Sequence, residues 1–330
     1  QAERQPHDEQ RDRQRALAPR AGCHRHGFRQ RGPRLGAAAQ YRGRSQTPRG
    51  GGVQRVVTLH HAREVASPGY YGVQLDSGIA VDIAATAHSG LARFTFPRVA
   101  DARLILRNAL EGDLLVAQAA DLQVVSPTLI TGSRLDSFCV SGVPTRIYFA
   151  ARFDRPLVGE VFGEPAAEPT HSRSLQGGVA LSFDARTRRA VHMKVGLSSV
   201  SEAAALANLD AEIPGWDLQA VRRQTEAAWD EYLGRVAVQG GGDSARQSLY
   251  TALYRVFLQP AVWSDVGGAY VGFDQQVHPP DGHVHYANFS GWDIYRSWAA
   301  LVALLAPAET SDMMRSLILS SQQGGALPRW

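Results

Sequence analysis

Residues 286–296, with the sequence YANFSGWDIYR, hold the side chains best suited to chemistry in this chain. The indole of Trp292 offers an apolar plate for one face of a sugar ring, while Asp293 and Arg296 offer a carboxylate and a guanidinium for paired hydroxyl groups. A loop rich in Gly, His and Pro precedes this stretch and a long apolar run follows it, which predicts a helix starting near Ser290. Asp293 and Arg296 are three residues apart and would share one face of that helix. We predict that Trp292, Asp293 and Arg296 contact a carbohydrate.

The same residues also have a purely structural interpretation. Ser290 and Asp293 have the spacing of a capping box, in which Asp293 only closes the start of the helix. Trp292 would then belong to the core, and Arg296 would be a solvated cation. Spacing alone leaves both interpretations open, and the wider sequence favours the first.

The composition is that of a globular protein long enough for two domains, with 330 residues of which 44% are hydrophobic and 20% charged. No apolar run reaches the roughly 18 residues of a membrane span, and the start of the chain shows no pattern of an export signal. Cys23 and Cys139 lie in stretches of very different character, so a structural disulfide is not expected.

Residues 1–52 differ from the rest of the chain in composition. Residues 1–55 carry thirteen arginines against four acidic residues, a net charge of +9, which leaves −5 for the remaining chain because the overall charge is +4. With almost no aliphatic residues and no periodicity, residues 1–52 are predicted to be a disordered Arg-rich segment. We interpret them as a sequence translated in a wrong reading frame or from a wrong start. An alternative is an arm for nucleic acid, which predicts salt-sensitive RNA or DNA binding.

Residues 53–198 are predicted to form an antiparallel β-sandwich. Apolar and polar residues alternate with period two from Ile79 to Ala84 and from Leu91 to Phe96, and turn sequences rich in Gly and Asp separate the runs. No helical pattern interrupts them, which is typical of a sandwich. Further strands are expected at 70–75, 102–107, 122–130, 145–151, 157–162, 178–183 and 190–197.

Residues 199–242 are predicted to form a helical linker with two helices, the second from Asp217 to about Leu233. Asp217 follows Pro-Gly-Trp and precedes a helical stripe, so we interpret it as an N-cap and not as a catalytic acid.

Residues 243–330 are predicted to hold three helices at about 244–258, 293–306 and 310–323. The second is apolar nearly all round from Trp298 onward, so it should be buried within a larger helical body. The third should place Met314, Leu317 and Ile318 on one face and end at Gly324-Gly325. Together they indicate the opening helices of an α/α barrel or bundle, with the chain ending inside that domain.

Three histidines in the loop before residue 286 raise the alternative of a zinc site. His283 and His285 form a His-x-His pair and His278 precedes them, but no further ligand follows at a recognisable spacing. We therefore rank zinc well below a sugar site.

A series of short segments carries a resemblance to a known family. In chain order they are HAREVASPGYY at 61–71, GLARFTFP at 90–97, residues 183–198, EIPGW at 212–216, LYTALY at 249–254, SDV at 264–266, FSGWDIYR at 289–296 and QGGALP at 323–328. Their order and approximate spacing resemble those of the glycosyl hydrolase family 92 α-mannosidases over most of residues 53–330.

This resemblance implies an antiparallel β-sandwich followed by the opening helices of an (α/α)6 barrel, with the sugar site between them. It also implies an exo-acting α-mannosidase that inverts the anomeric centre and uses calcium to bind mannose hydroxyls, help distort the ring and position the attacking water. Trp292, Asp293 and Arg296 match a segment at the sugar site, so they are the expected contacts to a terminal mannose. His61 and Glu64 are further candidates, either lining the site or serving the fold.

The sequence departs from the family pattern at several points. Ala62 replaces a glutamate, and Val266-Gly267-Gly268 replaces Val-Asp-Gly. Inverting hydrolysis needs an acid and a base about 6.5–9.5 Å apart. In the family both carboxylates, together with calcium ligands, come from later barrel segments. We therefore assign no catalytic residue and no metal ligand, do not promote Asp293 to catalytic acid, and expect these 330 residues to be an inactive fragment.

The resemblance implies mannose-containing glycans as partners and a secreted or periplasmic location. The alternative from a different class is a non-catalytic carbohydrate-binding β-sandwich protein. Under that alternative, glycan binding would survive deletion of residues 243–330.

Overall fold

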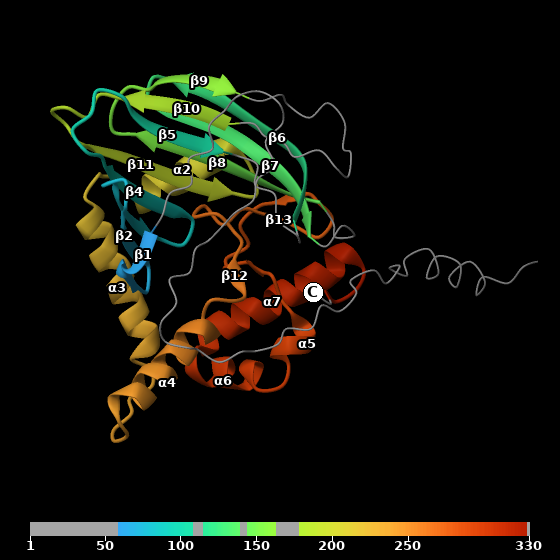
Figure 1. The fold of residues 1–330 in the computed structure, drawn as a ribbon. Helices are drawn as coiled ribbons and strands as arrows, with labels where there is room; N and C mark the ends of the chain where they lie inside the picture. Colours follow the sequence, from blue (N-terminus) through green and yellow to red (C-terminus); the bar gives the residue numbers. More distant parts are fainter. Residues whose placement is uncertain (1–58, 108–114, 139–143, 163–177, 329–330) are drawn as a thin grey trace, which may run out of the picture.

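The computed structural model describes residues 59–107, 115–138, 144–162 and 178–328 (Figure 1). The predictions made for residues 1–52, and those for Cys23 and Cys139, lie outside these ranges.

Two antiparallel sheets form the N-terminal part, which confirms the predicted β-sandwich (Figure 1). The larger sheet has eight strands in the order β1-β2-β3-β4-β11-β8-β7-β6, and the smaller has the order β5-β10-β9. The strands of the larger sheet, in that order, are Leu59–Ser67, Tyr70–Leu75, Ala80–Ala85, Ser89–Thr95, Ala190–Ser198, Thr145–Phe153, Leu129–Phe138 and Leu115–Ser126. Those of the smaller sheet are Ala102–Arg107, Gly178–Phe183 and Val158–Phe162.

The period-two alternation of the strands builds the core between the sheets. On β8, Phe149, Ala151 and Phe153 point into this core, while Ala150 between them is buried on the opposite face. Residues of β10 and of other strands meet them there, among them Val179, Leu181, Phe183, Ile130 and Val191.

The prediction of a single strand at 122–130 is wrong. The chain turns at Pro127 and Thr128, so that β6 and β7 form a hairpin whose pairs include Ser126 with Leu129. Both strands around the turn are apolar, and their hydrophobicity hid the break that the proline marks. Strand β1 was not predicted, because most of that edge strand is exposed and shows no alternation.

Two helices, α2 (Glu202–Glu212) and α3 (Leu218–Leu233), cover the second face of the larger sheet. Their side chains Leu209, Ile213, Leu218 and Val221 pack with Ala84 and Leu91 of the sheet. These helices therefore do more than link two domains, since they close one side of the sandwich. The Asp217 side chain accepts hydrogen bonds from the backbone N–H groups of residues 219 and 220, which confirms its assignment as an N-cap.

A glycine lets α2 approach the sheet closely. Gly196 lies on β11, and a Cβ atom there would be 2.1 Å from the carbonyl oxygen of Ala205 and 2.8 Å from the Cβ of Leu209. The helix axis is thus set by the absence of a side chain at residue 196.

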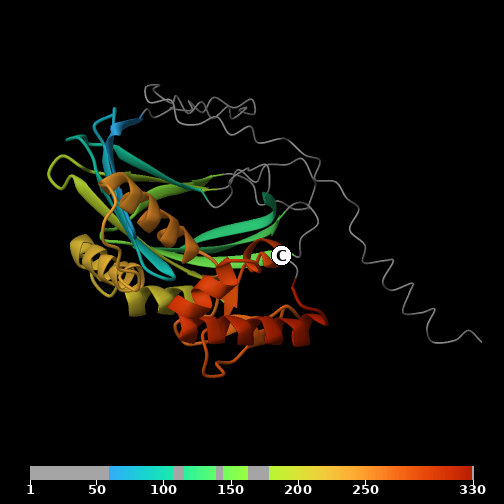
Figure 2. The ribbon, with the colours of Figure 1, turned by 90° about the horizontal axis from the view of Figure 1, so that it is seen from below.

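The C-terminal part contains four helices: α4 (Asp243–Val256), α5 (Gly291–Ile294), α6 (Trp298–Leu305) and α7 (Pro307–Gly324). Both views show α5, α6 and α7 together on one side of the sandwich, while α4 lies next to α3 (Figures 1 and 2). Their shared core contains Tyr286, Phe289, Val302, Ala306 and Met313.

Three helix predictions need correction. The continuous helix at 293–306 is broken into α5 and α6, although no Gly or Pro marks the break. Helix α6 is buried along one stripe only, because Val302 is enclosed while Leu304 is 78% exposed.

Helix α7 also buries an unexpected face. It turns Met313, Ser316 and Ser320 inward and leaves Met314 and Ile318 exposed. The small serines let α7 approach β15, whose Tyr286 N–H donates to Ser316 Oγ at 3.0 Å. The predicted end is confirmed, since Gly325 adopts a left-handed φ of 78° at the C-cap.

Candidate functional site

Segment 290–296 projects from a well-anchored piece of chain. Strand β15 (Tyr286–Ala287) pairs with β12 (Ala261–Val262), and Asn288 then turns the chain with a φ of 65°. Phe289 follows and is 4% exposed in the helical core. The next residues therefore leave the core from a fixed point.

Most side chains of this segment are exposed, although Ile294 packs partly buried against the helical core. The interpretation of Trp292 as a core residue is wrong. Trp292 is 63% exposed, and Asp293 and Arg296 are exposed as well. The predicted capping box does not form, because Ser290 caps no backbone N–H with its side chain and instead donates its hydroxyl to Asp293 Oδ2 at 2.5 Å. Arg296 does not pair with Asp293 among the described contacts. Its Nη2 donates to the Tyr295 hydroxyl at 3.1 Å.

His61 and Glu64 form a separate cluster on β1. His61 Nδ1 contacts Glu64, and the Tyr71 hydroxyl donates to the other oxygen of the same carboxylate. The hydrogen bond from Tyr71, followed by that from His61, lowers the pKa of Glu64. Figure 1 places β1 at the edge of the sandwich, away from α5. The structure therefore does not bring these two residues together with Trp292.

Two of the three loop histidines stack on the same aromatic ring. Tyr270 of β13 (Tyr270–Val271) stacks on His285 with ring centroids 3.8 Å apart, and on His278 of β14 (Val277–His278) at 5.2 Å. Burial is the main cause that lowers the pKa of His285 to about 4. Within the described ranges, no group of three or more His, Cys, Asp or Glu residues is placed to hold a metal ion.

Gln323 ties this loop to α7. Its Nε2 donates to the Tyr270 hydroxyl at 3.1 Å, and its Oε1 accepts the Phe273 N–H at 3.2 Å. The adjacent Gly324 lies against the Phe273 side chain, and a Cβ atom on Gly324 would be 3.3 Å from the Cβ of Phe273. Two residues of the QGGALP segment thus have a structural role in holding the loop that leads to β15.

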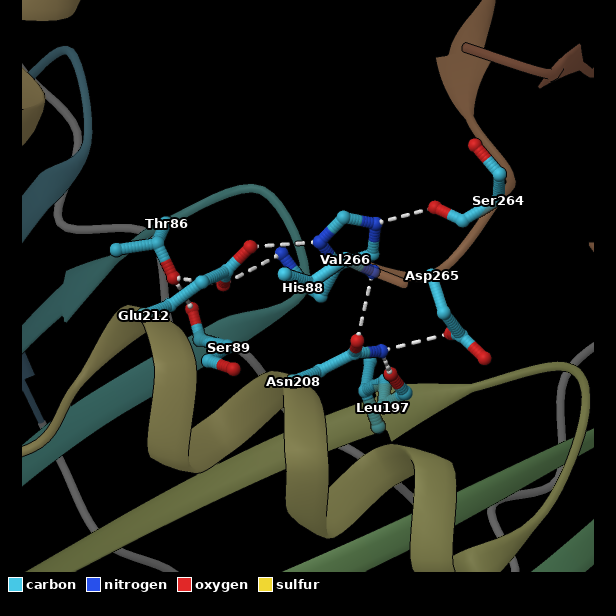
Figure 3. A network of polar contacts seen from close by, with 9 residues as sticks. All are labelled: Thr86, His88, Ser89, Leu197, Asn208, Glu212, Ser264, Asp265 and Val266. Carbon is cyan, nitrogen blue, oxygen red and sulfur yellow. Dashed lines mark hydrogen bonds and ion pairs between the residues drawn. The ribbon is translucent and has the colours of Figure 1, made fainter. Parts of the chain in front are cut away.

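A polar network connects the sandwich, α2 and the loop after β12 (Figure 3). His88, in the turn between β3 and β4, contacts Glu212 Oε1 through Nδ1 at 2.6 Å and the Ser264 carbonyl oxygen through Nε2 at 2.8 Å. Glu212 Oε2 also accepts hydrogen bonds from the His88 N–H and the Thr86 hydroxyl. Burial lowers the pKa of His88, but its contacts with Glu212 and with Ser264 outweigh burial and raise it above 6.5.

The same network has a second branch at Asp265. This carboxylate is 8% exposed and accepts hydrogen bonds from Ser198 Oγ and Asn208 Nδ2, both at 2.7 Å. Asn208 Oδ1 in turn accepts the Val266 N–H at 2.9 Å. Asp265 is therefore committed to the fold. The sequence showed SDV as a family-like segment, but no local pattern indicated its partners.

One cavity of about 370 Å³ lies between α3, α4, α6 and α7. Its walls are mainly apolar and aromatic, and its carboxylate, Glu309, is paired with Arg235 Nη2 at 3.0 Å. Burial and a hydrogen bond to Glu309 raise the pKa of Tyr232 in this wall to about 12. A single neutralised carboxylate does not provide an acid and a base, so we do not place glycoside chemistry there.

Comparison with known families gives two matches that follow one another along the chain. Residues 36–198 match the glycosyl hydrolase family 92 N-terminal domain, and residues 204–330 match the glycosyl hydrolase family 92 catalytic domain. The second range includes α5 and the whole of segment 290–296.

Individual relatives point to the same family. A protein of Arthroderma benhamiae, described as an uncharacterized secreted glycosidase, is 29% identical over 228 residues, which is 59% of this chain and 28% of that protein. A family GH92 alpha-mannosidase from Bacteroides thetaiotaomicron superposes with a TM-score of 0.73 at 26% identity over 81% of this chain and 37% of that one. It has also been solved in complex with mannoimidazole.

A second structure supports the fold alone. An inverting mannosidase of the same family and organism superposes with a TM-score of 0.73 at 23% identity, over 84% of this chain and 37% of that one. The chain thus spans only a little over a third of these solved mannosidases. No helix in the described part of the chain is long and apolar enough to cross a membrane.

Proposed function

Because the chain belongs to glycosyl hydrolase family 92, we propose that segment 290–296 binds a terminal α-linked mannose within a glycoside hydrolase that releases this sugar with inversion. The observation that carries the proposal is the position of Trp292. Its indole is largely exposed, yet it follows the buried Phe289 by only three residues in the range matched to the family's catalytic domain. A rigidly anchored, exposed indole is a suitable plate for a sugar ring.

The polar groups beside Trp292 are available for hydroxyl groups. Asp293 Oδ2 accepts a hydrogen bond from the Ser290 hydroxyl, whereas Asp293 Oδ1 has no hydrogen-bond partner among the described residues. Arg296 donates one hydrogen bond to Tyr295, which leaves most of the five guanidinium N–H donors for a ligand. The carboxylate would accept from one mannose hydroxyl, and the guanidinium would donate to another.

Turnover requires more than these three residues. Inversion needs a general acid and a general base on opposite sides of the glycosidic bond. In segment 290–296 the carboxylate is Asp293 alone, so we expect the purified 330-residue chain to hydrolyse an aryl α-mannoside no faster than a buffer control. Enzyme-dependent release of mannose would contradict this part of the proposal.

Calcium belongs to the proposal only for the whole family protein. The described residues contain no cluster of three or more acidic, His or Cys side chains suited to a metal. We therefore assign calcium no role in the steps proposed for these residues. The secreted glycosidase among the relatives supports export of the whole protein as a further proposal. A non-catalytic sugar-binding β-sandwich protein would not explain why residues 204–330 match the family's catalytic domain. We therefore rank this alternative function second.

Trp292→Ala should strongly weaken the binding of an α-mannoside by the chain. Loss of the stacking plate removes the apolar part of the contact, which for exposed aromatic–sugar contacts we take as about tenfold in affinity or more. Titration of methyl α-mannoside by calorimetry measures the effect. Leu304→Ala is the matched control, because Leu304 is an exposed apolar residue of α6 outside segment 290–296 and its removal should leave binding unchanged. Equal affinity of both variants and the wild type would count against the proposal.

A further inference from the structure

The contacts of His88 require two N–H groups on one imidazole ring. Nδ1 faces a carboxylate oxygen of Glu212, and Nε2 faces the backbone carbonyl oxygen of Ser264 (Figure 3). A carbonyl oxygen only accepts hydrogen bonds, and so does an ionised carboxylate. A neutral imidazole has one N–H and can satisfy only one of these acceptors, whereas an imidazolium satisfies both.

We infer that His88, as an imidazolium, is a positioning residue that fixes the loop at residues 264–266 to the sandwich and to α2. Ser264 and Asp265 belong to the range matched to the catalytic domain, whereas His88 belongs to the N-terminal domain. His88 therefore carries a charged contact from one family domain to the backbone of the other.

The charges around His88 favour this protonation state. Glu212 on α2 lies in direct contact, and the Asp265 carboxylate in the loop adds a second negative charge. The turn that carries His88 contributes the neutral Thr86 hydroxyl, which donates to Glu212. Among the described residues, neither Glu212 nor Asp265 forms an ion pair with an arginine or lysine, so His88 is the cation that compensates this part of the interface.

The position of this loop matters for segment 290–296. Ser264 Oγ accepts the His285 N–H at 3.0 Å, and the Trp263 N–H donates to the His285 carbonyl oxygen at 2.7 Å. His285 leads directly into β15, from which segment 290–296 projects. His88 thus sets where the sandwich meets the part of the chain that carries Trp292. Only this last consequence rests on the proposed function.

The signs of the two pKa shifts define the pH range of the contact. The folded pKa of His88 lies above 6.5, so its contribution is complete below 6.5 and disappears as the pH rises through the folded value. The folded pKa of Glu212 lies below 4.5, because its hydrogen bonds from His88 and Thr86 outweigh its burial. Its contribution is complete above 4.5 and disappears as the pH falls through the folded value. The contact is therefore strongest between pH 4.5 and 6.5.

The first test is an NMR titration of the His88 side chain in the wild-type chain of 330 residues. It should give a pKa above 6.5, and Glu212→Gln should lower that value. A wild-type pKa at or below 6.5, or one that Glu212→Gln leaves unchanged, overturns the inference. Because the wild-type titration needs no variant, it remains decisive if a substitution prevents folding.

The second test is amide hydrogen exchange of residues 263–268 in the wild type and in His88→Gln. About one pH unit below the measured pKa, the variant should exchange these amides roughly tenfold faster, as expected for the loss of a charge-assisted hydrogen bond. About one pH unit above it, the ratio of the two rates should fall towards one, since the wild type has lost its second N–H.

His60→Gln is the matched control, because His60 is half exposed at the sheet edge and its polar partner among the described residues is Asp76. It should exchange residues 263–268 at the wild-type rate at both pH values. A His88→Gln to wild-type ratio that is the same at both pH values overturns the inference. Neither test contains a sugar, so failure of mannose binding at Trp292 would not be confused with failure of the contact at His88.

Discussion

Gly196→Val should lower the free energy of unfolding by about 3 kcal/mol, at the upper end of overpacking effects. Valine favours strands by up to about 1 kcal/mol, which opposes this effect. The clash is larger, because the nearest atom to a new Cβ is the backbone oxygen of Ala205 at 2.1 Å, and a backbone atom cannot rotate away. Helix α2 must move off β11, and it carries Asn208 and Glu212 of the polar network with it.

Chemical denaturation followed by circular dichroism measures this change, and Gly215→Ala provides the control. Gly215 lies after α2, and a Cβ atom there meets nothing within 4 Å, so its substitution should cost less than about 0.5 kcal/mol. If Gly196→Val and Gly215→Ala unfold at the same denaturant concentration, the close packing of α2 on β11 is not as described.

Asp265→Ala should also destabilise the chain by about 3 kcal/mol, because hydrogen bonds to charged groups contribute about 1.5–3 kcal/mol. The substitution removes the acceptor of the Ser198 hydroxyl and of the Asn208 amide, both of which are buried. The loop should also detach from α2. In the variant, the rate of proteolytic cleavage between residues 263 and 270 should therefore exceed the rate at which the sandwich unfolds.

Asp243→Ala is the comparison variant for Asp265→Ala. The Asp243 side chain is 94% exposed and pairs with Arg246 on the surface of α4, so its loss should cost about 0–1 kcal/mol. Equal effects of the two substitutions on stability and on loop cleavage would show that Asp265 is not a buried tie between α2 and the loop.

Local patterns in the sequence were sufficient for much of the sandwich. Strands β2, β5 and β10 have the predicted bounds, because turn residues lie beside each of them in the sequence. The same holds for the N-cap of α3 at Asp217, whose signal lies within three residues. The prediction was wrong at the hairpin around Pro127, because two consecutive apolar strands resemble one long strand in the sequence.

The polar network could not be predicted in this way. His88 contacts a residue 124 positions away and another 176 positions away, so no spacing rule connects them. The break between α5 and α6 also has no local marker, although Phe289 before α5 and Trp298 at the start of α6 both pack in the helical core. The assignment of Trp292, Asp293 and Arg296 as sugar contacts stays a prediction. The structure adds that they are exposed and that Ser290, and not Arg296, holds Asp293.

The most direct test of the account observes the indole N–H of Trp292 during a sugar titration. The chain has six tryptophans, so its ¹⁵N-labelled indole signals can be resolved by NMR, and Trp292→Phe assigns the signal of interest. Methyl α-mannoside should shift the Trp292 signal in a saturable way. The signal of Trp298, which packs partly buried against the helical core and donates its indole N–H to the Val256 carbonyl oxygen, should not respond. An unshifted Trp292 signal up to the solubility limit of the sugar would contradict the assignment of segment 290–296 as a mannose contact.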